Sequence, residues 1–568
     1  MRFSGRRRLV YLYLREGWRR FSQRLAVGHL SAVRFAGSAP DRLIVAPTDL
    51  RSVDGFVADE IAAGRFPLAG RTLDCEGQSP FSVDLPSEEF AVRLQAFGWL
   101  RHLRAMEKNQ ASRLARMILD DWIATHGSVL SGIAWRPDVI AQRVIAWLCH
   151  SPVVLRDADY AFYRRFMRAL AFQVRYLRRI ADSTPDGEDR LRARIALAMA
   201  TLAMPAPAGR IRRAARNLDL ELDRQILPDG GHASRSPRAA LELLLDLLPL
   251  RQTYVNLGHD VPQRLTPAID RMFPALRFFR HQGGELALFN GAAYTPAHEL
   301  VSVLRYDESG TALSRRLPSL GYERLAAGET VVLVDAGTAL SVDLSTRASA
   351  GSLSMEMSSG RHRFIVNSGM PRFAGEAIRQ LSRATAAHSV ATLNDTSSSR
   401  ISTSSFLGRI LCGGVSRVDA TRNERQDGSD GLTVRHDGYR EAFGLFYERD
   451  LLLNARGNEI RGRERFLTPD GKLPAGGAGM GTAVVRFHVH PAIQLHQANE
   501  HEALLVAPDG ESWSLTCLDV PVVDEEDVFF ADPSGVRASR QLTLTMPVGE
   551  LPEIQWLMMR RNGPAPAN

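Results

Sequence analysis

Residues 365–395, with the sequence IVNSGMPRFAGEAIRQLSRATAAHSVATLND, form the stretch around which the chain is organised. It opens as an apolar strand, crosses a Gly/Pro turn, continues through Arg372, Arg379 and Arg383, and reaches His388 before a second strand-like run. Guanidinium groups match carboxylates and sulfates, and an imidazole transfers protons near neutral pH. The pattern predicts a loop between two strands that binds an anionic ligand. The alternative interpretation is a loop of solvated arginines with a structural histidine.

The residues that follow Gly283-Gly284 have the pattern of an all-β domain. Short β-rich runs lie at 330–335, 339–344, 363–366, 432–435, 483–490, 503–507 and 541–546. Asp509-Gly510 is a typical hairpin signal between two such runs. This half is therefore predicted to be a sandwich of antiparallel sheets.

The residues that precede this half, from about Ser87, have helical periodicity. Leu94, Phe97, Leu100 and Leu103 illustrate the spacing. Short loops rich in Pro and Gly join helices of similar length, which indicates stacked antiparallel hairpins that curve into an incomplete (α/α) toroid. The predicted fold class is thus multidomain α + β. The expected domains are a lead-in segment at 1–85, the toroid at 86–284 and the β-sandwich at 285–568.

The composition restricts the partners of the chain. The 568 residues carry a formal net charge of +8, and the excess is mostly arginine. This favours an acidic partner such as an acidic polysaccharide. Nucleic acid is not expected, because no zinc finger, phosphate loop or RNA-binding aromatic motif is present. The four cysteines are scattered and form neither a zinc module nor a disulfide framework.

The N-terminal sequence MRFSGRRRLVYLYLREGWRRFSQRL predicts a basic amphipathic helix. Arginines and a glutamate interrupt its apolar run, so we expect neither a signal peptide nor a transmembrane segment, which indicates a cytoplasmic protein. The helix is expected to pack on the body of the protein. Peripheral contact with a membrane surface is the alternative.

Several motifs resemble those of the heparinase II/III-like polysaccharide lyases. Asp229-Gly230-Gly231-His232 followed by Arg235-Ser236-Pro237 resembles a loop between toroid helices of that family, and FIVNSG…RATAAHSV resembles its strand leading to an Ala-His-Asn motif. The likeness spans about Trp99 to Trp556. It implies β-elimination at a uronic acid in the periplasm or outside the cell, with a Tyr and a His transferring protons and an Asn or His near the carboxylate.

Only some of the residues that this family uses in its reaction have counterparts in this sequence. His388 matches the family's sandwich histidine, but Ala239-Ala240 stand where the family has Tyr-His. The helix that usually carries Asn-His reads Arg-Leu-Arg-Ala-Arg at 190–194. Arginine cannot act as a base, because its guanidinium stays protonated.

We therefore assign candidate roles as follows. The candidates for proton transfer are His388, Tyr294 and His232, with Tyr254 as a further tyrosine. The candidates for substrate binding are Arg192, Arg194, Arg235, Arg238, Arg383 and Asn290. His488 and His490 lie two apart on a predicted strand and share a face, which suits a structural metal. We expect no cofactor, and the alternative is that these two histidines line a polar face of the strand.

Three functions stay open from the sequence. The first is a lyase that acts on a uronic-acid-containing glycan. The second is a catalytically inactive or repurposed protein that binds acidic glycans on the same scaffold. The third is an envelope protein that touches the membrane through its N-terminal helix. The oligomeric state is not predicted.

Overall fold

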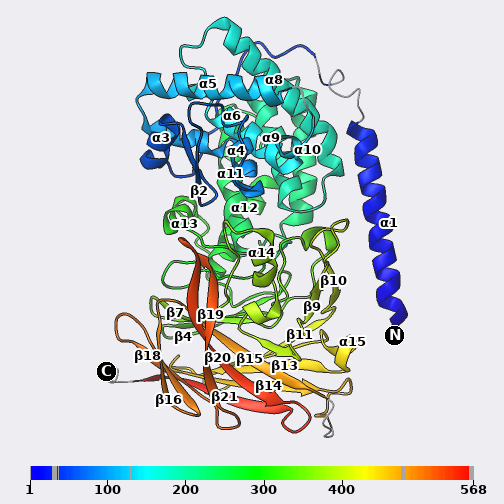
Figure 1. Cartoon of the computed structure of the whole chain (residues 1–568), viewed down its shortest axis with the longest axis vertical. Helices are drawn as coiled ribbons and strands as arrows, with labels where there is room; N and C mark the ends of the chain where they lie inside the picture. Colours follow the sequence, from blue (N-terminus) through cyan, green and yellow to red (C-terminus); the bar gives the residue numbers. More distant parts are fainter. Residues whose placement is uncertain (1, 28–34, 36, 128–129, 475–479, 562–568) are drawn as a thin grey trace.

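The computed structural model describes residues 2–27, 35, 37–127, 130–474 and 480–561. Helices make up the N-terminal half and antiparallel β-sheets the C-terminal half (Figure 1). This confirms the predicted fold class. The buried core of the helical half also contains Val331 and Leu333, so the first strands of the sandwich pack directly on the helices. The domain boundaries expected from the sequence stay a prediction.

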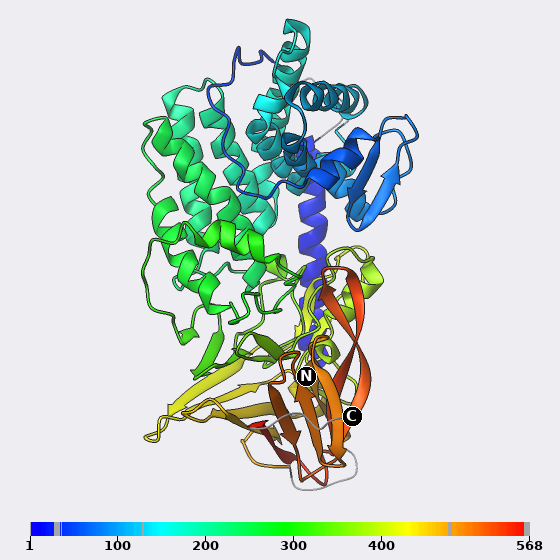
Figure 2. The same ribbon diagram turned by 90° about the vertical axis from the view of Figure 1, so that its left-hand side faces the viewer.

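The helices stand side by side above the sheets (Figure 2). They are α3 (Gly55–Ala62), α4 (Glu88–Ala96), α5 (Lys108–His126), α6 (Pro137–Cys149), α7 (Ser151–Val154), α8 (Tyr160–Ile180), α9 (Glu188–Ala203), α10 (Ala208–Gln225), α11 (Pro237–Asn256), α12 (Leu265–Phe278) and α13 (Ala297–Leu304). A hairpin of β1 (Arg65–Leu68) and β2 (Arg71–Asp74) and a 3-10 segment (Gly98–Ala105) lie among the first of them.

Helix α9 is the central element of the helical half. It contacts α6, α10 and α11, and every side chain from residue 191 to residue 203 is buried, including two arginines. Its Arg192 pairs with Asp246 of α11, whereas its Arg194 pairs with Asp182. Side chains that are two positions apart on a helix point in different directions, because each residue advances the helix by about 100°. The sequence analysis placed both arginines at one substrate site, and the structure separates them.

The C-terminal half contains two large antiparallel sheets and a two-stranded sheet of β9 (Ser399–Ile401) and β10 (Leu411–Gly414). One sheet has the order β11 (Val418–Glu424), β12 (Asp430–His436), β13 (Phe446–Leu453), β14 (Glu459–Leu467), β21 (Glu553–Arg561), β18 (Ser512–Thr516), β17 (Glu502–Val506) and β16 (Gln494–Asn499). The other has the order β19 (Val522–Asp532), β20 (Gly535–Pro547), β15 (Thr482–Val489), β7 (His362–Val366), β6 (Met355–Ser359), β5 (Thr330–Asp335), β4 (Tyr322–Ala327) and β3 (Arg316–Leu317). Their inner faces form one apolar core.

Two of the local predictions can be compared with the strands. The hairpin at Asp509-Gly510 is confirmed, since it joins β17 to β18 and Gly510 has a φ of +90°. The strand predicted at 339–344 is wrong, because that segment ends in a 3-10 turn (Val342–Leu344). Its alternating apolar residues suggested a strand, but Leu344 instead lines a pocket between the two halves.

Strand β15 determines where the stretch 365–395 lies. The end of β15 pairs with β7, and its beginning pairs with β8 (Ala391–Leu393). The residues between these two pairings leave the sheet, form α14 (Glu376–Ser382) and return. The excursion carries several of its side chains into the pocket between the helices and the sandwich.

Helix α1 (Arg2–Val27) confirms the helix predicted at the N-terminus, and it packs against the body of the protein. Arg15 pairs with Asp343 at 2.8 Å, and the ring of Tyr13 stacks on Phe406 with 5.7 Å between centroids. Both views show α1 alongside the rest of the chain (Figures 1 and 2). Across the described ranges, no helix combines the length and the apolar character that a membrane crossing requires.

Glu356 of β6 is a buried acceptor at the joint between the halves. One carboxylate oxygen lies 2.9 Å from Nε2 of His281, just after α12, and both side chains are fully buried. The other oxygen accepts hydrogen bonds from the backbone N–H groups of Leu288 and Asn367, at 2.9 and 3.1 Å. Although burial raises the pKa of Glu356, its hydrogen bond and charge interaction with His281 outweigh that effect and hold the pKa below its usual range.

We expect Glu356→Ala to destabilise the protein by about 3–5 kcal/mol, because it leaves His281 and two backbone donors buried without an acceptor. The free energy of unfolding in urea measures this loss. The matched control is Glu329→Ala, which removes a carboxylate that is 60% exposed and pairs with Arg560. A surface pair of this kind contributes less than about 1 kcal/mol. Equal losses in the two variants would contradict the role of Glu356.

Candidate functional site

A pocket with a volume of about 570 Å³ lies between the helices and the sandwich. Its walls come from α4, the 3-10 segment, α6, α9, α11 and the excursion between β7 and β8. Among the charged side chains of the lining, arginines outnumber carboxylates. The arginines are Arg51, Arg93, Arg101, Arg192, Arg238, Arg347, Arg372, Arg379, Arg383 and Arg409, and the carboxylates are Asp49, Glu89, Glu188, Glu242, Asp246, Glu299 and Glu376.

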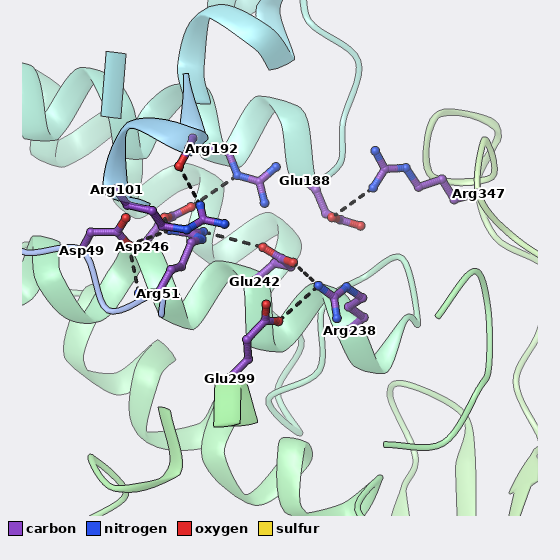
Figure 3. A network of polar contacts seen from close by, with 11 residues as sticks. Asp49, Arg51, Arg101, Glu188, Arg192, Arg238, Glu242, Asp246, Glu299 and Arg347 are labelled. Carbon is purple, nitrogen blue, oxygen red and sulfur yellow. Dashed lines mark hydrogen bonds and ion pairs between the residues drawn. The ribbon is translucent and has the colours of Figure 1, made fainter. Parts of the chain in front are cut away.

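One part of this lining is a network of ion pairs (Figure 3). Asp246 pairs with Arg51 at 2.8 Å and with Arg192 at 3.3 Å. Arg238 pairs with Glu242 at 2.6 Å and reaches Glu299 at 3.4 Å. Arg192 and Arg238, two of the predicted substrate-binding residues, therefore line the pocket with their charges already matched by carboxylates.

The pKa of Glu242 reflects the excess of positive charge in this network. Burial raises the pKa of the Glu242 carboxyl, but the surrounding guanidinium groups, Arg238 first and then Arg51 and Arg192, hold that pKa well below its usual range. The carboxylate is therefore ionised at any ordinary pH. This one negative charge balances only part of the positive charge of the surrounding arginines.

Four arginines of the lining form no ion pair within the part of the chain that the structure describes, and one of them, Arg383, donates to two backbone carbonyls instead. The other three are Arg93, Arg101 and Arg372. Arg93 and Arg372 both lie over the ring of Phe373, with 4.9 and 5.2 Å from guanidinium carbon to ring centroid. Arg101 donates to the carbonyl of Gly98 at 2.9 Å, and its Nε is buried without a partner. We call these three residues the unpaired arginine cluster.

The members of this cluster are electrostatically strained. Burial and then the charge of Arg372 lower the pKa of Arg93 to about 10. Burial and then Arg238 lower the pKa of Arg372, and burial and then Arg51 lower that of Arg101. A cation in this position is less stable than in water, because it has lost solvent and faces like charges. An anionic ligand would relieve both effects.

Two histidines that the sequence analysis missed also line the pocket. His150, at the end of α6, is 2% exposed and places Nε2 3.2 Å from Oδ2 of Asp49. Its Nδ1 is buried and has no hydrogen-bond partner among the residues that the structure describes. His102 accepts a hydrogen bond from the backbone N–H of Asp54 at 3.0 Å, and burial followed by the charge of Arg101 lowers its pKa to about 4. No motif marks either residue, since Asp49 lies 101 residues before His150.

The predicted proton-transfer histidines lie outside the lining of this pocket. His388 is 2% exposed, its Nδ1–H donates to the carbonyl of Ala384 at 2.8 Å, and burial lowers its pKa to about 4. His232 is 1% exposed and lies between Gln225 and Ser234, each 2.8 Å from a ring nitrogen. Burial lowers its pKa to about 4 as well. Both are neutral at pH 7, and their part in catalysis stays a prediction.

The predicted tyrosines occupy two different surroundings. Tyr294 is partly buried next to the pocket, and its backbone carbonyl accepts a hydrogen bond from Arg238 at 3.1 Å. Tyr254 is fully buried in the core of the helices, and its hydroxyl has no partner among the described residues. Burial and the charge of Asp219 raise the pKa of Tyr254 far above its usual range.

The other predicted substrate-binding residues divide between the pocket and the protein interior. Asn290 and Arg383 line the pocket. Asn290 donates to Tyr322 and Asp335, and the guanidinium of Arg383 donates to two backbone carbonyls at 2.7 and 2.9 Å. Arg235 is buried elsewhere and pairs with Asp335, so the structure does not bring it to the pocket.

The two histidines considered for a metal are held by other residues. Nδ1 of His488 lies 2.6 Å from a carboxylate oxygen of Asp527, and the ring of His490 lies 3.1 Å from a guanidinium nitrogen of Arg363. Burial and then Arg363 lower the pKa of His490 to about 2. Within the described ranges, no group of three side chains is suited to hold a metal ion. The expectation of a metal at this strand stays untested.

Comparison with known proteins gave matches along most of the chain. Residues 309–557 match the family model described as heparinase II/III-like, C-terminal. FtsZ-localized protein C of Caulobacter vibrioides (strain NA1000 / CB15N) is 32% identical over 564 residues, which cover 95% of each chain.

Solved structures with the same architecture include those of two lyases. Heparinase III matches with a TM-score of 0.71 and 13% identity over 90% of this chain and 86% of its own. A mutant of the heparan sulfate lyase HepC from Pedobacter heparinus matches with a TM-score of 0.62 and 16% identity over 91% and 85%. Identities this low show a shared fold.

Proposed function

Because the chain belongs to the heparinase II/III-like family, as its motifs predicted, we propose that the pocket between its two halves binds a uronic-acid-containing acidic glycan. The observation that carries this proposal is the unpaired arginine cluster of Arg93, Arg101 and Arg372, which lines the pocket without carboxylate partners among the described residues. Guanidinium groups bind carboxylates and sulfates with paired hydrogen bonds. A uronate carboxylate at this cluster would neutralise charges that the protein itself leaves unmatched.

The size of the pocket also supports a carbohydrate ligand. A volume of about 570 Å³ lies within the range of sites that enclose a small molecule or a short segment of a longer one. Its lining includes Trp99 and Leu68 in addition to the charged groups. Such surfaces suit the apolar face of a sugar ring, while the arginines bind its acidic group.

Two positions favour binding without elimination. The resemblance places a tyrosine of the family at Ala239 and its carboxylate-neutralising residues on the helix that carries Arg192. Both Ala239 and Arg192 line the pocket. A methyl group cannot transfer a proton, and Asp246 already occupies the guanidinium of Arg192. The pocket can therefore still hold a ligand, but the resemblance implies that two side chains needed for elimination, at the positions of Ala239 and Arg192, have been replaced.

A second function, β-elimination in the same pocket, is favoured by His150 and Asp49. The ring of His150 faces Asp49 through Nε2 and has a free Nδ1, which is the arrangement of a base that a carboxylate orients. In this reaction Nδ1 takes the C5 proton, and the electron pair of the C5–H bond forms the C4–C5 double bond. The C4–O bond breaks, its electron pair goes to the departing glycosidic oxygen, and that oxygen takes a proton from water. The unpaired arginine cluster stabilises the negative charge that develops on the carboxylate.

The name of the relative from Caulobacter supports a proposal about location. That protein is described as localised with FtsZ, and its identity of 32% extends over 95% of both chains. We therefore expect a fluorescent fusion of this chain to overlap with FtsZ in the cells that produce it. A fusion spread evenly through the cell, with full-length protein on a blot, would contradict this.

We expect Arg372→Gln to weaken the binding of acidic oligosaccharides at least tenfold, because a hydrogen bond between charged groups contributes about 1.5–3 kcal/mol. Isothermal titration calorimetry with heparin, chondroitin and alginate fragments measures the change. Arg113→Gln on the exposed surface of α5 is the matched control and should bind like the unchanged protein. Unchanged affinity in Arg372→Gln would remove the cluster from the site.

Elimination leaves an unsaturated uronate whose conjugated double bond absorbs in the ultraviolet. If the second function holds, absorbance rises when the protein is mixed with the same glycans, and His150→Ala abolishes the rise without weakening binding. A rise that persists in His150→Ala would exclude this residue as the base. A flat trace with measurable binding rejects elimination and leaves glycan binding as the function.

A further inference from the structure

A second pocket lies on the helical half, where the end of α8, the middle of α9 and the beginning of α10 meet. Its volume is about 400 Å³, and it shares no lining residue with the pocket between the two halves. Four arginines line it, whereas its lining contains a single carboxylate. These residues are Arg178, Arg194, Arg210, Arg213 and Asp182.

Arg194 contributes a buried donor to this second pocket. Its side chain projects from α9 with only 7% of its surface exposed, and one terminal nitrogen pairs with Asp182. Its Nε is buried and has no hydrogen-bond partner among the described residues. A buried donor without an acceptor costs about 1–3 kcal/mol, so a ligand oxygen that accepts from it stabilises the folded protein.

The other three arginines crowd this donor with positive charge. Within the part of the chain that the structure describes, Arg178, Arg210 and Arg213 form no ion pair with a carboxylate. Burial, followed by the charges of Arg210, Arg175 and Arg213, lowers the pKa of Arg178. Mutual repulsion of this kind destabilises an empty pocket and favours one that holds an anion.

The N-terminus of α10 faces the same pocket. The helix begins at Ala208 after Pro207, and Gly209 is part of the pocket lining. The amides of Ala208 and Gly209 donate to no acceptor in the described residues, and a Cβ added at Gly209 would meet open space. Free amides and the positive end of the helix dipole make such a terminus attractive to phosphate.

We propose that this second pocket binds a small phosphate-bearing anion. The excess of guanidinium groups over carboxylates suits a ligand with more than one negative charge. Its phosphate oxygens accept hydrogen bonds from Nε of Arg194 and from the free amides of α10, while Arg178, Arg210 and Arg213 neutralise its charge. The inference is independent of glycan binding, because none of these residues lines the pocket between the two halves.

The experiment is a calorimetric titration of the full chain with inorganic pyrophosphate and, separately, with sulfate at the same ionic strength. We expect pyrophosphate to bind, and the double variant Arg210→Gln/Arg213→Gln to weaken this binding at least tenfold. Arg212→Gln is the matched control, since Arg212 is an exposed residue of the same helix that does not line the pocket. It should leave the affinity unchanged, and so should Arg372→Gln in the other pocket.

Each of the remaining outcomes would overturn the inference. Absence of pyrophosphate binding at millimolar concentration would show that the pocket takes no phosphate. Sulfate binding of equal strength would reject selectivity for phosphate. Equal weakening in Arg212→Gln would indicate general attraction to a basic surface, and weakening in Arg372→Gln alone would assign the ion to the pocket between the two halves. Because Arg210 and Arg213 are exposed, the double variant is expected to fold.

Discussion

The buried carboxylate of Glu356 is the interaction on which the geometry of this protein depends. It accepts hydrogen bonds from His281 at the end of the helices and from the backbone of Leu288 in the connecting segment. It also accepts from the backbone of Asn367, where β7 ends and the excursion begins, and the side chain of Asn367 in turn accepts from Ser389. One acceptor without water around it thus joins the helical half, the linker and both ends of the excursion. A buried charge tolerates no loss of its partners, so these segments have fixed relative positions.

The excursion then separates two kinds of residue that are neighbours in the sequence. Its outer part carries Arg372 into the pocket, whereas His388 lies at its base, where β8 returns to β15. Arg449 holds that base by donating to the carbonyl of Ser389, and Glu464 pairs with Arg449 in turn, with both side chains fully buried. The base therefore has the polar network of a buried core, and the outer part places the charge of Arg372 at the pocket.

The pocket of this chain contains both paired and unpaired charged side chains. The pocket lies between the helices and the sandwich, and its carboxylates pair with some of its arginines, whereas the unpaired arginine cluster has no carboxylate partner among the described residues. Under the proposed function the two sets of guanidinium groups differ in role, because the paired ones stabilise the wall and the unpaired ones are free to bind an anion. The second pocket has the same division, since Arg194 pairs with Asp182 and its other three arginines have no carboxylate partner in the described part of the chain.

The sequence by itself determined the fold class, the helix at the N-terminus and the family, because periodicity and ordered motifs are local properties. It also identified Arg192, Arg238, Arg383 and Asn290, which do line the pocket. Only the tertiary structure decided which charges are matched, since Asp246 meets Arg192 across 54 residues and Asp49 meets His150 across 101. It likewise placed Arg194 in a different pocket from Arg192 and buried His388. Burial and charge pairing arise from contacts between segments that are distant in the sequence, so local sequence patterns do not predict them.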